Sequence, residues 1–246
     1  MELVTLAQRP EIAEAMQQIN IAAWPAFMKQ AGASDRHWST LLQVYPEYQL
    51  ALCDNDHHVM AIGHLIPAIW DGTSDGLPNG WDDVLMTALN RRGRSFNAIC
   101  MMGAVVSPNS RTSGLGLSLL RMMKTFAFEH SPVLIAPVRP VLKPRYPLTP
   151  IERYIRWTYR NGASLPFDPW LRVHVRLGAT IIKGAPHSMV VTGSVAQWES
   201  WSGMRFPESG LYIVPDALHA ISIDYLNDAG KYEEPHVWVH YPFSQD

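Results

Sequence analysis

Cysteine and long apolar runs are both scarce in this sequence of 246 residues. Its two cysteines, Cys53 and Cys100, each lie in an apolar run typical of a strand, which excludes a disulfide framework and favours a reducing compartment. No apolar run approaches the roughly 20 residues that span a bilayer. The first residues also lack the basic and apolar regions of a signal peptide. We therefore expect a cytoplasmic protein that has no membrane partner.

A strong charge of one sign is missing as well. Only 17% of the residues are charged, the formal net charge is -2, and no Lys/Arg cluster is dense enough to form a nucleic-acid-binding face. No low-complexity tract marks a domain boundary. Because 47% of the residues are hydrophobic, the chain can bury a sizeable core. We expect a single domain over residues 1 to 246 and no nucleic-acid partner.

Metal-binding and hydrolase motifs are also absent from the sequence. Among ten histidines, the two close groupings are His57 with His58 and His236 with His240, and neither has a third ligand at a recognisable spacing. No G-x-S-x-G sequence marks a serine nucleophile. We therefore expect neither a metal site nor a serine hydrolase.

Periodic apolar residues in the first 90 positions predict helices and one hairpin. A spacing of three and four residues predicts helices over residues 10 to 30, 34 to 43 and 82 to 90. Two apolar runs, residues 48 to 53 and 59 to 66, are separated by a polar turn and predict a β-hairpin.

The clearest supersecondary pattern lies between residues 98 and 138. A continuous apolar run over residues 98 to 106 predicts a strand that is buried on both faces. A turn that contains glycine, an amphipathic helix over residues 114 to 130 and a second strand over residues 133 to 138 follow it. This order is typical of a parallel, right-handed crossover.

The rest of the chain predicts an insertion, a short helix and a C-terminal extension. Residues 140 to 167 are rich in Pro, Arg and aromatic residues, and we expect an insertion that lines a pocket, with a helix at residues 151 to 159. Asp168 and Pro169 fit the N-cap and first position of a helix that ends before Gly178. Further strands or apolar runs are expected at residues 180 to 183, 189 to 195, 212 to 214, 220 to 223 and 237 to 241, and residues 196 to 246 form the extension. Trp198, Trp201, Met204 and Phe206 fit core packing better than a pocket lining.

The turn before the helix at residue 114 contains two glycines that suit an anion site. Gly114 and Gly116 let the backbone approach a ligand, and the helix N-terminus adds roughly half a positive charge. The turn matches neither the dinucleotide G-x-G-x-x-G motif nor a Walker loop. The glycine spacing alone fits both a diphosphate site and a helix start that binds no ligand.

The whole arrangement resembles the acetyl-CoA-binding motif of the GNAT acetyltransferase superfamily. The strand ends in Val106-Ser107-Pro108, and Arg111-Thr112-Ser113-Gly114-Leu115-Gly116 supplies the R-x-x-G-x-G pattern. The likeness covers about residues 1 to 195 and implies a mixed α/β (α+β) fold with a sheet of about seven strands flanked by helices. It also implies that acetyl-CoA or another acyl-CoA is the co-substrate. Its pyrophosphate would bind the backbone of Arg111, Thr112, Ser113, Gly114, Leu115 and Gly116, and its pantetheine arm would lie beside Val106, where the two strands diverge.

Two side chains are candidates for the chemistry. Many GNAT enzymes carry the pattern F-Y-x-K-x-G-F after the second strand, and its Tyr can protonate the CoA thiolate. His174 takes that position here, four residues before Gly178, and an imidazole can accept or donate a proton near neutral pH. Packing of His174 beside Trp170 is the alternative. Arg139, at the end of the second strand, fits either a clamp on a ligand carboxylate or an ordinary ion pair.

The resemblance implies an acyltransferase and leaves its acceptor open. Residues 136 to 140 (APVRP) and 173 to 179 are also similar to GNAT-like domains of polyketide synthase loading modules, which implies decarboxylation or acyl transfer to a carrier protein. Val141 follows the strand end and offers no hydroxyl, which weakens decarboxylation. The main hypothesis is direct N-acetylation of a small molecule in a ternary complex, with Asp71, Glu199 and Glu208 as available bases. Transfer to an acyl carrier protein and a silent acyl-CoA sensor are the alternatives, and a homodimer remains open.

Overall fold

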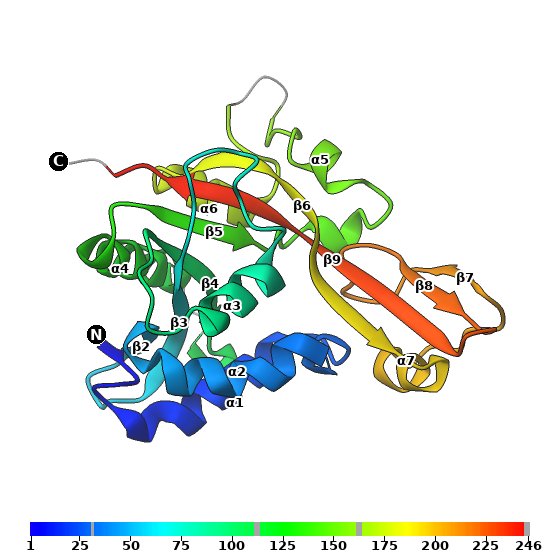
Figure 1. Ribbon diagram of the computed structural model, residues 1–246, viewed down its shortest axis with the longest axis horizontal. Helices are drawn as coiled ribbons and strands as arrows, with labels where there is room; N and C mark the ends of the chain where they lie inside the picture. The colour runs from blue at the N-terminus through cyan, green and yellow to red at the C-terminus, as the bar shows by residue number, and fades with distance from the viewer. Residues whose placement is uncertain (31, 111–113, 161–163, 244–246) are drawn as a thin grey trace.

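The computed structural model describes residues 1 to 30, 32 to 110, 114 to 160 and 164 to 243, and it leaves out the side chains of residues 30 to 36. Within these ranges a single mixed sheet of nine strands runs in the order β1-β2-β3-β4-β5-β9-β8-β7, and β6 pairs along β9 (Figure 1). Its strands are β1 (Glu2–Thr5), β2 (Gln49–Cys53), β3 (Val59–Ala68), β4 (Ala98–Val106), β5 (Leu134–Val138), β6 (Thr180–Gly193), β7 (Gly210–Tyr212), β8 (Ile221–Asp224) and β9 (Ala229–Tyr241).

Helices cover both faces of the sheet (Figure 1). They are α1 (Ala13–Ala23), α2 (Gly32–Val44), α3 (Trp81–Asn90), α4 (Leu115–His130), α5 (Ile151–Tyr154), α6 (Pro169–Arg176) and α7 (Val195–Ser202). Along β2, Leu50 and Leu52 pack in the core beneath α4, whereas Ala51 and Cys53 pack beneath α1. This alternation is the two-residue period of a strand with both faces buried. None of the described helices combines the length and hydropathy needed to cross a membrane.

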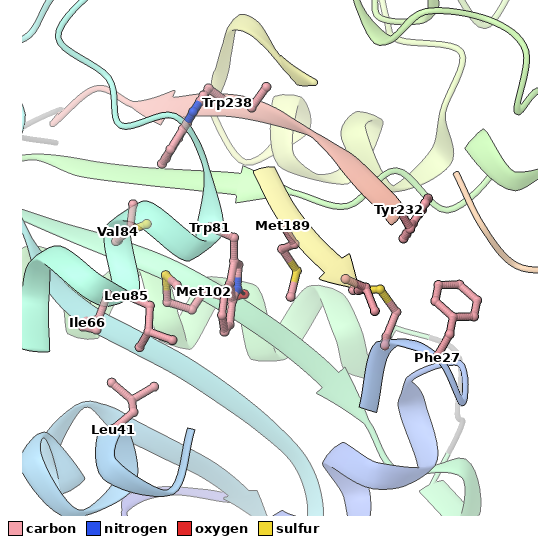
Figure 2. Packing of buried hydrophobic residues seen from close by; sticks show 14 of the residues in the cluster. Phe27, Leu41, Ile66, Trp81, Val84, Leu85, Met102, Met189, Tyr232 and Trp238 are labelled. Atoms are coloured by element: carbon pink, nitrogen blue, oxygen red, sulfur yellow. Dashed lines mark hydrogen bonds between the residues drawn. The ribbon is translucent and has the colours of Figure 1, made fainter. Parts of the chain in front are cut away.

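A third core lies under α2 and α3 and extends to the C-terminal strands. Figure 2 shows Trp81 of α3 beside Met102 and Leu85 of α3 beside Ile66, with Leu41 of α2 below them in the view. The same cluster continues to Trp198 and Phe206, which are buried, and to Trp201 and Met204, which pack against it; the prediction that these four residues pack a core is confirmed.

The pattern between residues 98 and 138 is confirmed closely. The strand has the predicted bounds, α4 begins at Leu115, and β5 runs parallel to β4. The hairpin of β2 and β3 and the helices α2 and α3 also lie where the sequence predicts them. Cys53 and Cys100 are both buried and free, so the expected absence of a bridge between them holds.

The predicted helix over residues 10 to 30 is wrong in its second half. α1 ends at Ala23 because Trp24 precedes a proline, and a residue before proline is forced out of the helical region. Trp24 accordingly has an extended backbone (φ -102°, ψ 144°). Pro25 then offers no N–H to continue the helix, and residues 28 to 30 form only a short 3-10 turn.

Other departures lie in the C-terminal half. The predicted helix at residues 151 to 159 is a single turn, α5. The two strands predicted between residues 180 and 195 are one long strand, β6, interrupted by register shifts against β9. The sheet has nine strands, more than the expected number of about seven. β1, whose short apolar run was missed, forms one edge, and the β7–β8 hairpin of the extension forms the other.

Asp168 ties α6 to the insertion, and α6 in turn positions His174. Its Oδ1 accepts the backbone N–H groups of Trp170 and Leu171, at 2.9 and 3.2 Å, as the predicted N-cap requires. Its Oδ2 accepts from the Leu142 N–H at 2.8 Å and from the Tyr154 hydroxyl at 2.9 Å. The carboxylate is 1% exposed, so few of these bonds can be replaced by water.

Replacement of Asp168 should therefore destabilise the protein strongly. We expect Asp168→Ala to lower the free energy of unfolding by about 3 kcal/mol, because a helix cap and two buried donors lose their acceptor together. Asp168→Asn, which keeps one acceptor oxygen, should lose less. Urea denaturation measures both, with the exposed Asp75→Ala as control. A loss for Asp168→Ala as small as that of the control would contradict this account.

Candidate active site

The two central parallel strands separate after a short paired stretch. Among the described residues, β4 and β5 pair only at Ile99 with Leu134 and at Cys100 with Ile135. Beyond this point the β4 edge that faces β5, at residues 102 to 106, has no strand partner, and Pro137 of β5 has no N–H to offer. Unpaired backbone groups need another partner, so this split can bind an extended ligand arm through its main chain.

A cavity of about 410 Å³ passes through the split. On one side it is lined by Leu119 and Met123, which belong to the core beneath α4. On the other side it is lined by Trp24, at the end of α1, and by His236 of β9. Residues from both faces of the sheet therefore line one cavity, which suits a site where two ligands meet.

The predicted pyrophosphate cradle lies at one end of this cavity. Gly116 and Val106 line it, and a Cβ atom at Gly116 would be in van der Waals contact with Trp170, at 3.7 Å, and with Val106, at 3.8 Å. Gly114 has a φ of +91°, a conformation that favours glycine. Leu115 is buried in the core, which leaves only its backbone for a ligand. Arg111, Thr112 and Ser113 lie outside the described residues.

His174 lines the same cavity from α6 and is 3% exposed. Its Nδ1 lies 2.5 Å from the Tyr241 hydroxyl, and the Trp170 ring meets the imidazole edge-on at 5.1 Å. Its Nε2 is buried and has no partner within the described structure. Burial lowers the pKa of His174 to about 3, so the imidazole is neutral near pH 7. Buried polar atoms are normally hydrogen-bonded, so an unpartnered nitrogen on a residue that lines the cavity makes His174 a candidate ligand contact.

Arg139 lies at the cavity wall, but its guanidinium is already engaged. Its Nε donates to Glu234 Oε1 at 2.8 Å, and its Nη2 donates to Glu234 Oε2 at 3.3 Å and to the Asp216 carbonyl at 2.9 Å. The guanidinium donors that could have bound a ligand carboxylate thus bind the carboxylate of Glu234 instead. This is the ordinary ion pair that was the alternative for Arg139. Burial alone would raise the pKa of Glu234, but Arg139 and the bond from His236 outweigh burial and hold that pKa to about 2.

His236 continues this network on the cavity wall. Its Nε2 lies 3.2 Å from Glu234 Oε1, and its Nδ1 lies 2.8 Å from Ser188 Oγ, which also accepts the Trp81 backbone N–H. Because Glu234 is ionised, it can only accept, so the His236 proton is on Nε2 and Nδ1 accepts from the Ser188 hydroxyl. Both nitrogens of His236 are therefore occupied.

Several of these residues carried no usable signal in the sequence. Glu234 and His236 come from β9, nearly 100 residues after Arg139, and only the sheet brings them together. For Trp24 the sequence did contain a signal: the proline that follows it predicts that α1 ends at this point. The three carboxylates considered as bases line neither this cavity nor the smaller one beside it: they are Asp71, Glu199 and Glu208. The insertion contributes one wall residue, Val141, which is less than expected.

Two buried histidines beside the cavities make stability depend on pH. Burial lowers the pKa of His64 on β3, like that of His174, to about 3. Unfolded chains bind protons at such groups below pH 6.5 whereas the folded protein does not, so stability should fall as pH drops from 6.5 toward 3. We expect His64→Gln to reduce the stability lost between pH 7 and pH 5 by about 2 kcal/mol, measured by urea denaturation. His187→Gln, at an exposed site, is the control, and an unchanged pH dependence in His64→Gln would disprove the account.

Comparison with known proteins agrees with this geometry, although no protein-family model matches the chain. The arginine N-acetyltransferase avaD of Aspergillus versicolor is 28% identical, over 98% of this chain and 93% of that protein. The loading GNATL domain of CurA from Lyngbya majuscula has a TM-score of 0.63 at 16% identity, over 98% of this chain and 97% of that one. The GphF GNAT-like decarboxylase, solved with isobutyryl-CoA, has a TM-score of 0.62 at 17% identity, over 99% and 100% of the two chains. Along nearly its whole length the chain is thus similar to an arginine N-acetyltransferase, and it shares the fold of GNAT-like domains.

Proposed function

We propose that this enzyme transfers the acetyl group of acetyl-CoA directly to a nitrogen of arginine, or of a small molecule that contains arginine. The cavity that crosses the sheet carries the proposal, because a donor and an acceptor can meet there from opposite faces. The acceptor class is supported by the similarity to an arginine N-acetyltransferase over almost the full length of both chains. In the reaction a neutral acceptor nitrogen forms a bond to the acyl carbon and the carbon–sulfur bond breaks. The proton that the nitrogen loses ends on the departing thiolate, which leaves as the CoA thiol.

The residues of the split fit acetyl-CoA by chemistry and by space. Backbone N–H groups at Gly114 to Gly116 converge at the N-terminus of α4, where a helix stabilises anionic oxygens. The same role falls to the backbone of Arg111, Thr112 and Ser113. The open edge of β4 that ends at Val106 would take up the amide groups of the pantetheine arm. Bound acetyl-CoA supplies the activated acyl group.

His174 acts in this proposal as a hydrogen-bond donor and not as a proton donor. A neutral imidazole that accepts from the Tyr241 hydroxyl at Nδ1 carries its proton on Nε2, the nitrogen that has no protein partner. Loss of that proton would leave an imidazolate anion, which is too unstable to form at neutral pH. A fixed Nε2–H can nevertheless stabilise negative charge that develops on the thioester oxygen or on the departing sulfur.

Arg139 has a positioning role in this proposal. It holds Glu234 and, through Glu234, the ring of His236 at the acceptor side of the cavity. Val141 lines the cavity at the strand end, so no hydroxyl is offered there for decarboxylation. Amine acetylation therefore fits the site better than the chemistry of loading modules.

Acetyl transfer can be tested with acetyl-CoA and L-arginine. We expect release of free CoA thiol together with an arginine product heavier by one acetyl group, detected by mass spectrometry. Gly116→Asp should greatly weaken CoA binding in calorimetry, because it brings a negative charge to the phosphate site. Thr125→Asp adds the same charge to an exposed position about 13 Å further along α4 and should bind CoA normally. Normal CoA binding by folded Gly116→Asp, or no product from any arginine derivative, would overturn the proposal.

Replacement of His174 should affect turnover and spare cofactor binding. We expect His174→Ala to lower kcat by about 100-fold or more, the usual effect of losing one preorganised donor, with little change in the dissociation constant of CoA. His174→Gln, whose amide can still donate, should retain part of the rate. His174 stays neutral between pH 5 and pH 9, so its titration should not change the rate over this range. Any pH dependence of the wild-type rate should therefore persist in His174→Gln. A loss below about threefold in His174→Ala would remove the residue from the mechanism.

A further inference from the structure

A second, smaller cavity of about 130 Å³ lies beside the first. The two cavities share part of their lining, namely Trp24, Met102, Gly103 and Val105. Met102 is the extra residue of a β-bulge in β4, because His64 pairs with Gly103 and Leu65 pairs with Met101. The second cavity therefore begins where the first one crosses the sheet, next to the proposed site of acyl transfer.

Three tryptophans and three methionines make up half of the residues that line this second cavity. Trp38 of α2 and Trp81 of α3 stack with their ring centres 5.7 Å apart and their planes 22° apart. The Trp81 Nε1 donates to the Met102 carbonyl at 2.8 Å, which fixes the ring against the bulge. Figure 2 shows Trp81 with Met102 and Met189, and all three line the cavity. Trp24 and Met28 complete the apolar surface.

The polar side chains at the second cavity form their hydrogen bonds with protein groups. Gln49 donates to the carbonyls of Tyr45 and Leu65, so its Oε1 must accept, and it lies 2.8 Å from His64 Nδ1. The proton of His64 is thus on Nδ1, and its Nε2 accepts from Asn20 at 3.2 Å. His64 is neutral over the physiological range. Among the described lining residues the only permanent charge is that of Lys29, which is an exposed residue, and none is a carboxylate.

We propose that the second cavity is a subsite for a flat, apolar group of the acceptor. This inference rests on the proposed function and extends it. A guanidinium or ammonium placed there would lose its hydration without gaining an anionic partner, whereas aromatic faces and thioethers bury a flat ring well. The volume is close to that of the roughly 150 Å³ cavity that holds benzene in another protein. The acceptor is therefore an arginine derivative with one ring-sized apolar substituent, which lies in the subsite and leaves its nitrogen at Gly103.

Two arginine derivatives that differ only in that substituent test the subsite. L-Arginine anilide and L-arginine amide both present the α-amine and the guanidine, and only the anilide carries a phenyl ring. We expect kcat/KM to be at least about tenfold higher for the anilide, since burial of even small apolar groups in a pocket gives discrimination of this order. Equal values for the two acceptors would overturn the subsite.

A matched pair of variants tests whether the phenyl ring of the anilide binds in the second cavity. Ile21 lines the second cavity and is 50% exposed, so Ile21→Trp should fill the cavity without disturbing the core. It should lower the anilide-to-amide ratio of kcat/KM at least fivefold. Ile213→Trp makes the same change at a residue that is 42% exposed and lines neither cavity, and it should leave the ratio unchanged. Equal ratios in wild type and Ile21→Trp would place the phenyl ring elsewhere.

Calorimetry separates failure of the subsite from failure of the proposed function. The CoA-saturated protein should bind the anilide at least about tenfold more tightly than the amide, whether or not either compound is acetylated. Tighter binding of the anilide with no acetylation of either compound would retain the subsite and overturn acetyl transfer to arginine. Acetylation of both compounds with equal affinity would retain the proposed function and overturn the subsite.

Discussion

The separation of β4 from β5 after two residue pairs is the constraint on which the site depends. Paired strands would satisfy their own backbone groups and seal the sheet, whereas the separated strands leave main-chain donors and acceptors open along a cavity that crosses the sheet. The glycine-containing start of α4 lies at one end of this opening. The candidate anion site and the cavity are thus parts of one backbone feature.

The last strand supplies side chains to both sides of the cavity. Along β9, Val237, Val239 and Tyr241 pack toward α4, whereas Tyr232 and Trp238 pack in the core on the other face. Tyr241 therefore reaches His174 on one side, and His236, which is bonded to Glu234, lines the cavity on the other. Because successive residues of a strand point to opposite faces, a register shift of one residue would exchange these groups.

The titratable side chains buried beside the two cavities carry little unpaired charge. His64 and His174 are both held neutral by burial, and the ionised pair Arg139 and Glu234 satisfies itself. Fixed dipoles, backbone N–H groups and neutral donors remain to act on the ligands. Such groups need little reorganisation when charge develops, which is the condition under which they stabilise a transition state most.

The sequence by itself determined the β4–α4–β5 unit and the Asp168 cap, because each depends on a local pattern: a buried apolar run followed by an amphipathic helix, and a proline after an N-cap residue. It also pointed to His174. Tertiary structure alone decided which groups meet His174 and Arg139, since Tyr241 and Glu234 lie 67 and 95 residues away in the chain. It likewise decided that burial keeps His174 neutral and that three indoles from α1, α2 and α3 enclose one cavity, because burial and long-range pairing leave no periodic trace in the residues themselves.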